Sequence, residues 1–196
     1  MTEREQALAR AEQWKQHIVE IALPLETSKR QRAAASLLHL SIEHHSGIHC
    51  LVDHQLDSAA FALLRPQWET YVRGVWLRTT ADEALVEKFL EDKTDLKFPK
   101  MLGSVEPEGR RQPMLDQNKA VSDKFNDFTH GGVRQISLRN RTSHIETITS
   151  DKEIAALVYM SITFCYQALA EIADLVGDNV LKLDLNAAIK KVAPPR

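Results

Sequence analysis

The chain has 196 residues and a formal net charge of −2 at pH 7, so it is long enough for one compact domain and not basic enough for a general nucleic-acid coat. Charged residues make up 27% and hydrophobic residues 43% of the sequence, a balance that excludes an intrinsically disordered protein. Because the longest apolar run, Ile154 to Cys165, is well short of the ~20 residues of a membrane span and the charged N-terminus has no signal-peptide core, we expect a single cytoplasmic domain over residues 1–196 with no membrane contact.

Apolar residues recur with helical spacing through nearly the whole sequence, and only the short piece Ile145 to Ile148 alternates as a strand does. The pattern predicts an all-α fold, a single helical bundle of five to seven helices. In chain order the expected helices cover about residues 2–24, 28–55, 57–78, 80–92, 114–129 and 150–176, with a short final helix at 179–192. We expect the first two to form an antiparallel pair, and the second, the third and the long helix at 150–176 to supply most of the core.

Capping signals indicate where these helices begin. Three pairs have the spacing of a capping box: Thr2 with Glu5, Thr80 with Glu83, and Ser150 with Glu153. Asp57 is expected to cap the third helix, and Pro66 to kink it. The prolines and glycines between 99 and 113 predict a loop with one short helical turn at 97–102.

The second helix carries two histidines on its apolar seam. The seam has heptad spacing and consists of Ala35, Leu38, Ile42, His45, His49, Val52 and Leu56. A histidine pair at i,i+4, with Asp53 one turn further, can begin a metal site, but no other residue has ligand spacing. We therefore expect hydrogen-bonded core histidines, no metal and no cofactor. Cys50 and Cys165 form no metal or redox motif and are expected to be small core residues.

Three charged residues of the third helix, Arg65, Glu69 and Arg73, follow one another at i,i+4 spacing among apolar neighbours. Two interpretations remain open. The first is a partly exposed salt-bridge ladder; the second is a buried pair of guanidinium groups, held by one carboxylate, that receives a phosphate or carboxylate. His130, at the glycine-terminated end of a later helix, can meet this ladder across the bundle interior. The candidate binding residues are therefore Arg65, Glu69, Arg73 and His130.

The segment from Asn126 to His144 concentrates histidine, arginine and amide side chains. Within it, Arg139-Asn140-Arg141-Thr142-Ser143-His144 matches R-N-x-x-x-H, which resembles the signature of the HEPN superfamily. These are small helical-bundle proteins, many of them metal-independent ribonucleases of toxin and phage-defence systems. The resemblance implies Arg139, Asn140 and His144 as catalytic residues, with His130 as the alternative histidine, and a homo-oligomer in which two copies of the segment approach one another.

A broader resemblance covers roughly residues 30–176. The pattern A-A-F-A-L-L-R-P-x-x-E-x-Y-x-R-G-x-W, from Ala59 to Trp76, is followed by N-x-F-T-H-G-G-x-x-Q from Asn126 to Gln135. Together they resemble a family of uncharacterised bacterial all-helical proteins near the HEPN-like group. The resemblance implies a helical fold in which Arg65, Glu69, Arg73 and His130 are the recurring polar positions, and it implies no established activity.

Two classes of function follow. In the first, the protein is HEPN-like and acts on RNA: His144 or His130 moves the 2′-hydroxyl proton and Arg139 neutralises the developing phosphate charge. In the second, the bundle is not an enzyme and works by dimerising or by binding a protein or a small anionic ligand. The sequence leaves open whether the protein is an enzyme, and whether Arg139 and His144 face a common cleft decides between the two classes.

Overall fold

Helices form most of the part of the chain that the structure, a computed structural model, describes: residues 1–18, 23–24, 27–129, 132–137, 139, 143 and 149–192. The helices are α1 (Glu3–Lys15), α2 (Lys29–Asp53), α3 (Asp57–Thr79), α4 (Glu83–Leu90), α5 (Phe98–Ser104), α6 (Glu108–Thr129), α7 (Val133–Ser137), α8 (Asp151–Val176) and α9 (Asn179–Val192). No strand occurs in these ranges. The all-α class is therefore confirmed, with more helices than the expected five to seven; the strand-like piece at 145–148 lies outside the described residues.

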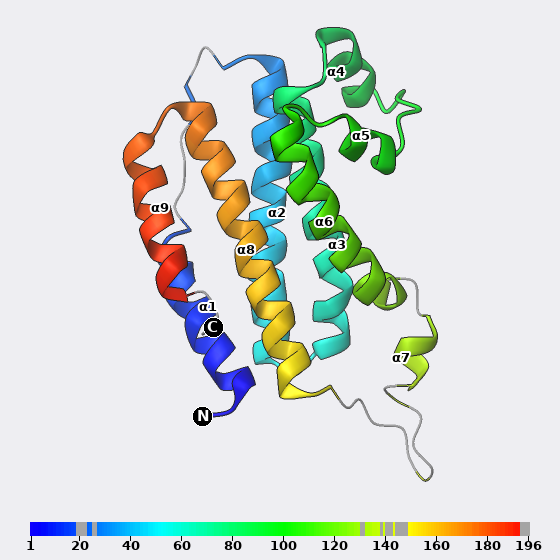
Figure 1. The fold of residues 1–196 in the computed structure, drawn as a ribbon, viewed down its shortest axis with the longest axis vertical. Helices are drawn as coiled ribbons and strands as arrows, with labels where there is room; N and C mark the ends of the chain where they lie inside the picture. The colour runs from blue at the N-terminus through cyan, green and yellow to red at the C-terminus, as the bar shows by residue number, and fades with distance from the viewer. Residues whose placement is uncertain are drawn as a thin grey trace.

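The long helices lie side by side as a bundle (Figure 1). The closest packing joins α2 to α3, with α8 against both; α6 covers α3, while α1 and α9 cover α8. Gly74 permits the close approach of α3 to α2, since a Cβ atom there would lie 2.7 Å from Leu38 Cγ. The tryptophans Trp14, Trp68 and Trp76 are all fully buried. Helices α2, α3 and α8 therefore supply most of the core, as expected.

Several helix starts follow the sequence and others do not. The capping boxes of Thr2 with Glu5 and Ser150 with Glu153 are both present. The expected box of Thr80 with Glu83 is wrong. Thr80 ends α3, and Asp82 instead accepts the hydrogen bond from Leu85 N–H at the start of α4. An aspartate side chain caps a helix as well as a threonine does, so Thr80 and Asp82 were both possible N-caps of this helix.

Asp57 does not cap α3. It is the first residue of that helix, and Leu56 precedes it without a side-chain cap. The Asp57 carboxylate instead receives two hydrogen bonds from the Arg4 guanidinium of α1, at 3.0 and 3.1 Å. Asp57 pairs with Arg4 instead of capping α3 because a buried carboxylate requires a charged partner. The α3 helix continues through Pro66.

The first helix is shorter than expected and has a different main neighbour. It ends at Lys15 rather than near Pro24. It runs antiparallel to α2 but packs mainly against α8, where the Trp14 and Tyr166 rings meet edge to face at 6.2 Å. Burial of Trp14 against the most apolar helix of the chain outweighs pairing with the neighbouring helix in sequence.

The segment expected as a loop around 99–113 is largely helical. Besides α5, it contains the start of α6, which begins at Glu108 and continues through Pro113. Arg110, in the first turns of α6, is bonded to Glu171 of α8. This tertiary ion pair stabilises a helical start that the local proline and glycine content disfavours.

Helix α8 meets the length and composition of a membrane span, and it is the one such helix in the described ranges. Its apolar window is 56% buried within the bundle. Burial of this kind is typical of a core helix. The capping box at its start is as expected, and Gly177, in the left-handed conformation, follows its last residue.

Candidate functional site

The Arg65–Glu69–Arg73 ladder lies on α3 as one connected unit. Arg65 Nε is 2.8 Å from Glu69 Oε1, and Arg73 Nη2 is 3.2 Å from Glu69 Oε2. A single carboxylate therefore holds two guanidinium groups, one with each oxygen. The Arg73 guanidinium also lies 6.0 Å from the centre of the Phe98 ring, within cation–π range. Glu69 thus fixes the positions of both guanidinium groups on α3.

The ladder is only partly buried. The side chains of Arg65 and Arg73 are 32% and 35% exposed, and that of Glu69 is 19% exposed. The buried interpretation of this ladder is therefore wrong, because about a third of each guanidinium side chain is open to solvent. The same exposure leaves the two cations accessible to an anionic ligand.

The C-terminal part of α6 approaches the N-terminal half of α3. Trp68 Nε1 donates to Asn118 Oδ1 at 3.0 Å, and the Phe61 and Phe128 rings stack at 4.5 Å. The end of α6 therefore lies beside Phe61, which is one helical turn before Arg65 on α3. His130 itself lies outside the described residues, so the expected contact between His130 and the ladder remains a prediction.

Replacing Glu69 with alanine should cost about 1 kcal/mol of unfolding free energy, since it removes two partly exposed ion pairs. Equilibrium unfolding in urea measures this cost. Glu91→Ala, which removes the exposed pair with Lys93, is the matched control and should change stability by less than ~0.5 kcal/mol. A loss of several kcal/mol at Glu69 would mean that its two arginines behave as buried charges.

Arg139 lies against the start of α3. With residues 55–59 it lines a cavity of about 220 Å³, and its side chain is half-buried. Asn140 and His144 lie outside the described residues. Of the three catalytic residues that the R-N-x-x-x-H motif implies, the structure therefore describes only Arg139. That Arg139 and His144 share a cleft remains a prediction.

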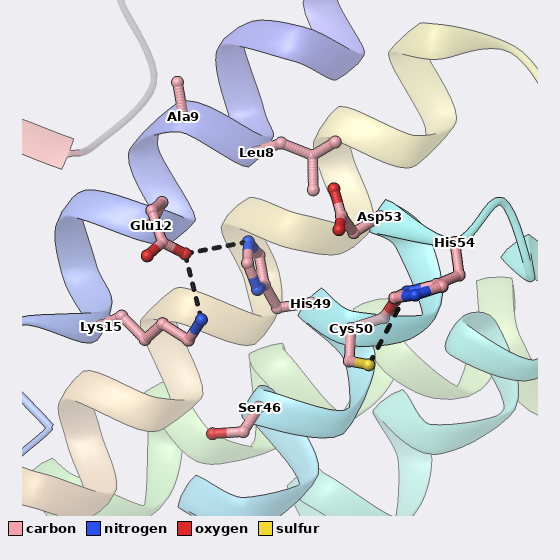
Figure 2. Close-up of a pocket in the computed structure, with 9 residues that line it drawn as sticks. All are labelled: Leu8, Ala9, Glu12, Lys15, Ser46, His49, Cys50, Asp53 and His54. Atoms are coloured by element: carbon pink, nitrogen blue, oxygen red, sulfur yellow. Dashed lines mark hydrogen bonds and ion pairs between the residues drawn. The ribbon is translucent and has the colours of Figure 1, made fainter.

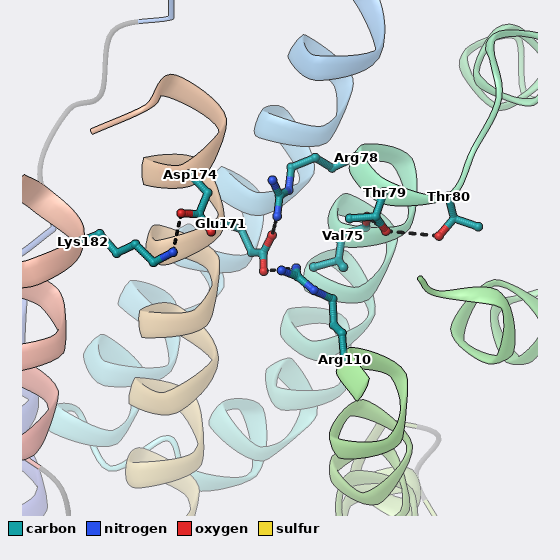
Figure 3. A network of polar contacts seen from close by, with 8 residues as sticks. All are labelled: Val75, Arg78, Thr79, Thr80, Arg110, Glu171, Asp174 and Lys182. Atoms are coloured by element: carbon teal, nitrogen blue, oxygen red, sulfur yellow. Dashed lines mark hydrogen bonds and ion pairs between the residues drawn. The ribbon is translucent and has the colours of Figure 1, made fainter. Parts of the chain in front are cut away.

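A charged group that the sequence did not indicate connects three helices (Figure 3). Glu171 of α8 bonds with one carboxylate oxygen to Arg78 of α3 and with the other to Arg110 of α6. The Glu171 side chain is only 10% exposed. Nearby, burial is the main cause that raises the pKa of Tyr71, with the Glu171 charge adding to it and Arg110 and Arg78 opposing it. This pair of arginines on one carboxylate is more buried than the ladder.

A chain of buried hydrogen bonds joins α2, α3 and α8. Ser161 Oγ donates to Gln67 Oε1 at 2.8 Å, and Gln67 Nε2 donates back to the Ser161 carbonyl at 3.0 Å. His45 Nδ1 lies 2.8 Å from Ser161 Oγ. Since the Ser161 proton is directed at Gln67, His45 Nδ1 must carry the proton that it shares with Ser161. Burial, with a smaller effect of His49, lowers the pKa of His45 to about 3, so this ring is neutral. The expected hydrogen-bonded core histidine is confirmed at His45.

A family model matches residues 38–193, from within α2 to the end of α9. It describes a family of unknown function (DUF6988). The chain belongs to this family. No curated protein and no solved structure matches the chain. The matched region includes the ladder, the ion pairs of Glu171 with Arg78 and Arg110, and the buried hydrogen bonds of His45, Ser161 and Gln67. It leaves out α1.

Two signals in the sequence could have found the polar groups that were missed. Glu171 is the one charged residue in the mainly apolar stretch 164–173 of α8. Ser161 interrupts the same helix on its buried face. An isolated charge on a buried face implies a partner, although its identity depends on how the helices pack.

Metal-ligating side chains do not gather in the described part of the chain: no group of three or more that could hold an ion occurs there. His49 is partly buried, at 14% side-chain exposure, and faces Glu12 of α1 at 3.8 Å rather than His45.

The two cysteines differ from each other: Cys165 is buried as expected, while Cys50 is exposed, so the expectation of a core position for Cys50 is wrong.

Proposed function

We propose that the protein binds RNA through a backbone phosphate at the Arg65–Glu69–Arg73 ladder and cleaves it without a metal ion, as a HEPN-like ribonuclease of the cytoplasm. The observation that supports the proposal is the bridge made by Glu69. It holds two guanidinium groups, each about a third exposed, at fixed positions on one helix. Since Glu69 engages one nitrogen of the Arg73 guanidinium, other N–H groups of Arg73 can donate to a phosphate oxygen.

Arginine suits this role because its planar guanidinium donates parallel hydrogen bonds to phosphate oxygens. The positive charge is local, since the whole chain has a net charge of −2. Binding should therefore depend on a few phosphate contacts and on the ladder itself, rather than on a broad basic surface. The Phe98 ring lies under the Arg73 guanidinium and helps to hold it in position.

For cleavage, His144 or His130 removes the proton from a 2′-hydroxyl, and the 2′-oxygen attacks the adjacent phosphorus. The bond from phosphorus to the 5′-oxygen breaks, and that oxygen takes a proton as it leaves, either from the histidine that was protonated in the first step or from water. The products carry a 2′,3′-cyclic phosphate and a 5′-hydroxyl. Arg139 neutralises the charge that develops on the phosphate, and Asn140 provides an additional amide donor. The step uses no oxidant, reductant or metal.

The position of Arg139 is compatible with a bound strand that also reaches the ladder. Arg139 lies beside residues 55–59, and Arg65 follows on the same helix, about 9 Å beyond residue 59 at 1.5 Å per residue. Self-association through helix faces, which would bring two Arg139 segments together, is part of the proposal. Sedimentation of the intact chain should therefore show a homodimer.

Cleavage of a single-stranded RNA oligonucleotide should persist in excess chelator, because a general base and a cationic clamp need no metal. It should fall at least ~100-fold in both Arg139→Ala and His144→Ala, and gel analysis should detect 2′,3′-cyclic phosphate ends. Loss of activity in His130→Ala alone would assign the base to His130. Cleavage that stops in chelator would contradict the metal-independent mechanism.

RNA binding is tested separately from cleavage. Arg73→Gln should weaken binding about tenfold, because one charge-assisted contact contributes roughly 1.5 kcal/mol. Arg111→Gln removes the same charge near the start of α6 and should have little effect. RNA that binds without being cleaved would exclude the ribonuclease step. An absence of both binding and cleavage would favour a non-catalytic bundle that dimerises or binds a protein or a small anionic ligand.

A further inference from the structure

A second candidate site lies between α1 and α2, separate from the ladder on α3. It is a cleft of about 510 Å³ lined by Leu8, Ala9, Glu12, Lys15, Ser46, His49, Cys50, Asp53 and His54 (Figure 2). Small-molecule sites usually have volumes of about 300–1,000 Å³. The size of this cleft therefore fits a small organic ligand, and its lining indicates the chemical class.

The charges around the cleft favour a cation. The lining contains two carboxylates, those of Glu12 and Asp53, and one ammonium group, that of Lys15. Lys15 Nζ pairs with Glu12 at 3.1 Å. Asp53 has no ion-pair partner within the described ranges. Its carboxylate is thus the excess negative charge of the cleft.

The end of α2 adds to this negative potential. Asp53 is the last residue of the helix, and no basic residue lies in its last turn. The C-terminal end of a helix carries a partial negative charge, which a cation stabilises. Arg4 donates to the Val52 carbonyl at 2.6 Å, but the same guanidinium is already paired with Asp57. The helix end and the Asp53 carboxylate therefore act in the same direction.

His49 occupies the space between the two carboxylates in Figure 2. Burial is the main cause that lowers its pKa, and Lys15 lowers it further, against the opposing effects of Glu12, Asp53 and a backbone hydrogen bond with Leu8. The ring is therefore uncharged near neutral pH and adds no competing positive charge. Beside it, His54 Nδ1 donates to the Cys50 carbonyl at 2.8 Å.

We propose that this cleft binds a small molecule with a short apolar body and one or two ammonium groups. One ammonium pairs with Asp53 at the end of α2, and a second shares Glu12 with Lys15. The Lys15–Glu12 pair is half exposed, at 51% and 62%, so rearranging it costs little. The side chains of Leu8 and Ala9 contact the apolar body. A metal ion fits the cleft less well, since no group of three or more metal-ligating side chains is present among the described residues.

Calorimetric titration of the whole chain with 1,4-diaminobutane tests the proposal. The expected result is saturable one-site binding, accompanied by shifts of the His49 and His54 ring signals in NMR spectra. Two probes with the same carbon chain serve as comparisons: 1,4-butanediol, which is uncharged, and butanedioate, which is anionic. Neither should bind. Equal binding of the diol would overturn the assignment of a cation, and absence of saturation by the diamine at millimolar concentrations would overturn the site.

Asp53→Asn should weaken binding of the diamine at least ~10-fold, the usual effect of losing one charge-assisted contact. Asp95→Asn removes the same charge at an exposed position away from the cleft and should leave binding unchanged. Equal losses of binding in the two variants would mean that the diamine responds only to the net charge of the protein and has no site at Asp53. Thermal unfolding confirms that both variants fold, and RNA binding should be the same in both, since this cleft and the ladder are separate.

Discussion

Replacing Glu171 with alanine is expected to destabilise the protein by about 3 kcal/mol, because Arg78 and Arg110 then remain in a largely buried position without their carboxylate. The arginine side chains are 21% and 28% exposed, so they can turn partly toward solvent, and the cost stays below that of a fully buried pair. For a chain of this size, 3 kcal/mol corresponds to a fall in Tm of roughly 6–12 °C. Thermal and urea unfolding both measure it.

Two comparisons separate unpaired charge from lost packing. Glu87→Ala removes an exposed pair with Lys29, with side chains 49% and 65% exposed, and should change stability by less than ~0.5 kcal/mol. Changing Glu171, Arg78 and Arg110 together to Leu, Met and Met should recover most of the stability, because apolar residues of similar size can replace a buried ion group. A single Glu171→Ala variant as stable as the starting protein would show that the three-helix bridge contributes nothing.

The helices were predictable wherever local signals agree with packing. The capping box at Ser150 and the glycine at 177 define both ends of α8, and each signal acts within one turn of helix. Prediction failed where a contact with a residue distant in sequence determines whether a segment is helical. The start of α6 depends on Arg110 reaching Glu171, which lies 61 positions later. No local pattern contains that contact, so the prolines and glycines around it favour a loop.

The candidate site shows the same limit. The i,i+4 spacing of Arg65, Glu69 and Arg73 was enough to predict their ion pairs, since residues four apart on a helix are neighbours. Their exposure was not predictable, because it depends on how closely α5 and α6 cover α3. The partners of His45 were hidden for a related reason. Gln67 and Ser161 come from two other helices, and although a serine on a buried helix face implies a partner, the sequence does not show that His45 and Gln67 are the partners.

The free energy of unfolding should increase with pH between about pH 4 and 6.5, and His45 should account for a large part of the increase. In the unfolded chain this ring has the ordinary pKa of 6.5, whereas burial lowers the pKa to about 3 in the folded protein. Between these values the unfolded state binds one more proton, so acid favours unfolding. The contribution is fully present above pH 6.5 and is lost as the pH falls, to a total of about 4–5 kcal/mol near pH 3.

Urea unfolding at several pH values, compared between the starting protein and His45→Gln, isolates this effect. Glutamine has an amide donor for Ser161 and no titrating group, so the pH dependence should flatten by as much as ~1.4 kcal/mol per pH unit. The half-buried His44 and His49, whose pKa values burial also lowers, titrate in both proteins and cancel in the comparison. His39→Gln, at an exposed position of the same helix, should leave the profile unchanged. Parallel profiles for His45→Gln and the starting protein would mean that His45 accepts a proton in the folded state, which requires water or an acceptor to reach the buried chain of hydrogen bonds.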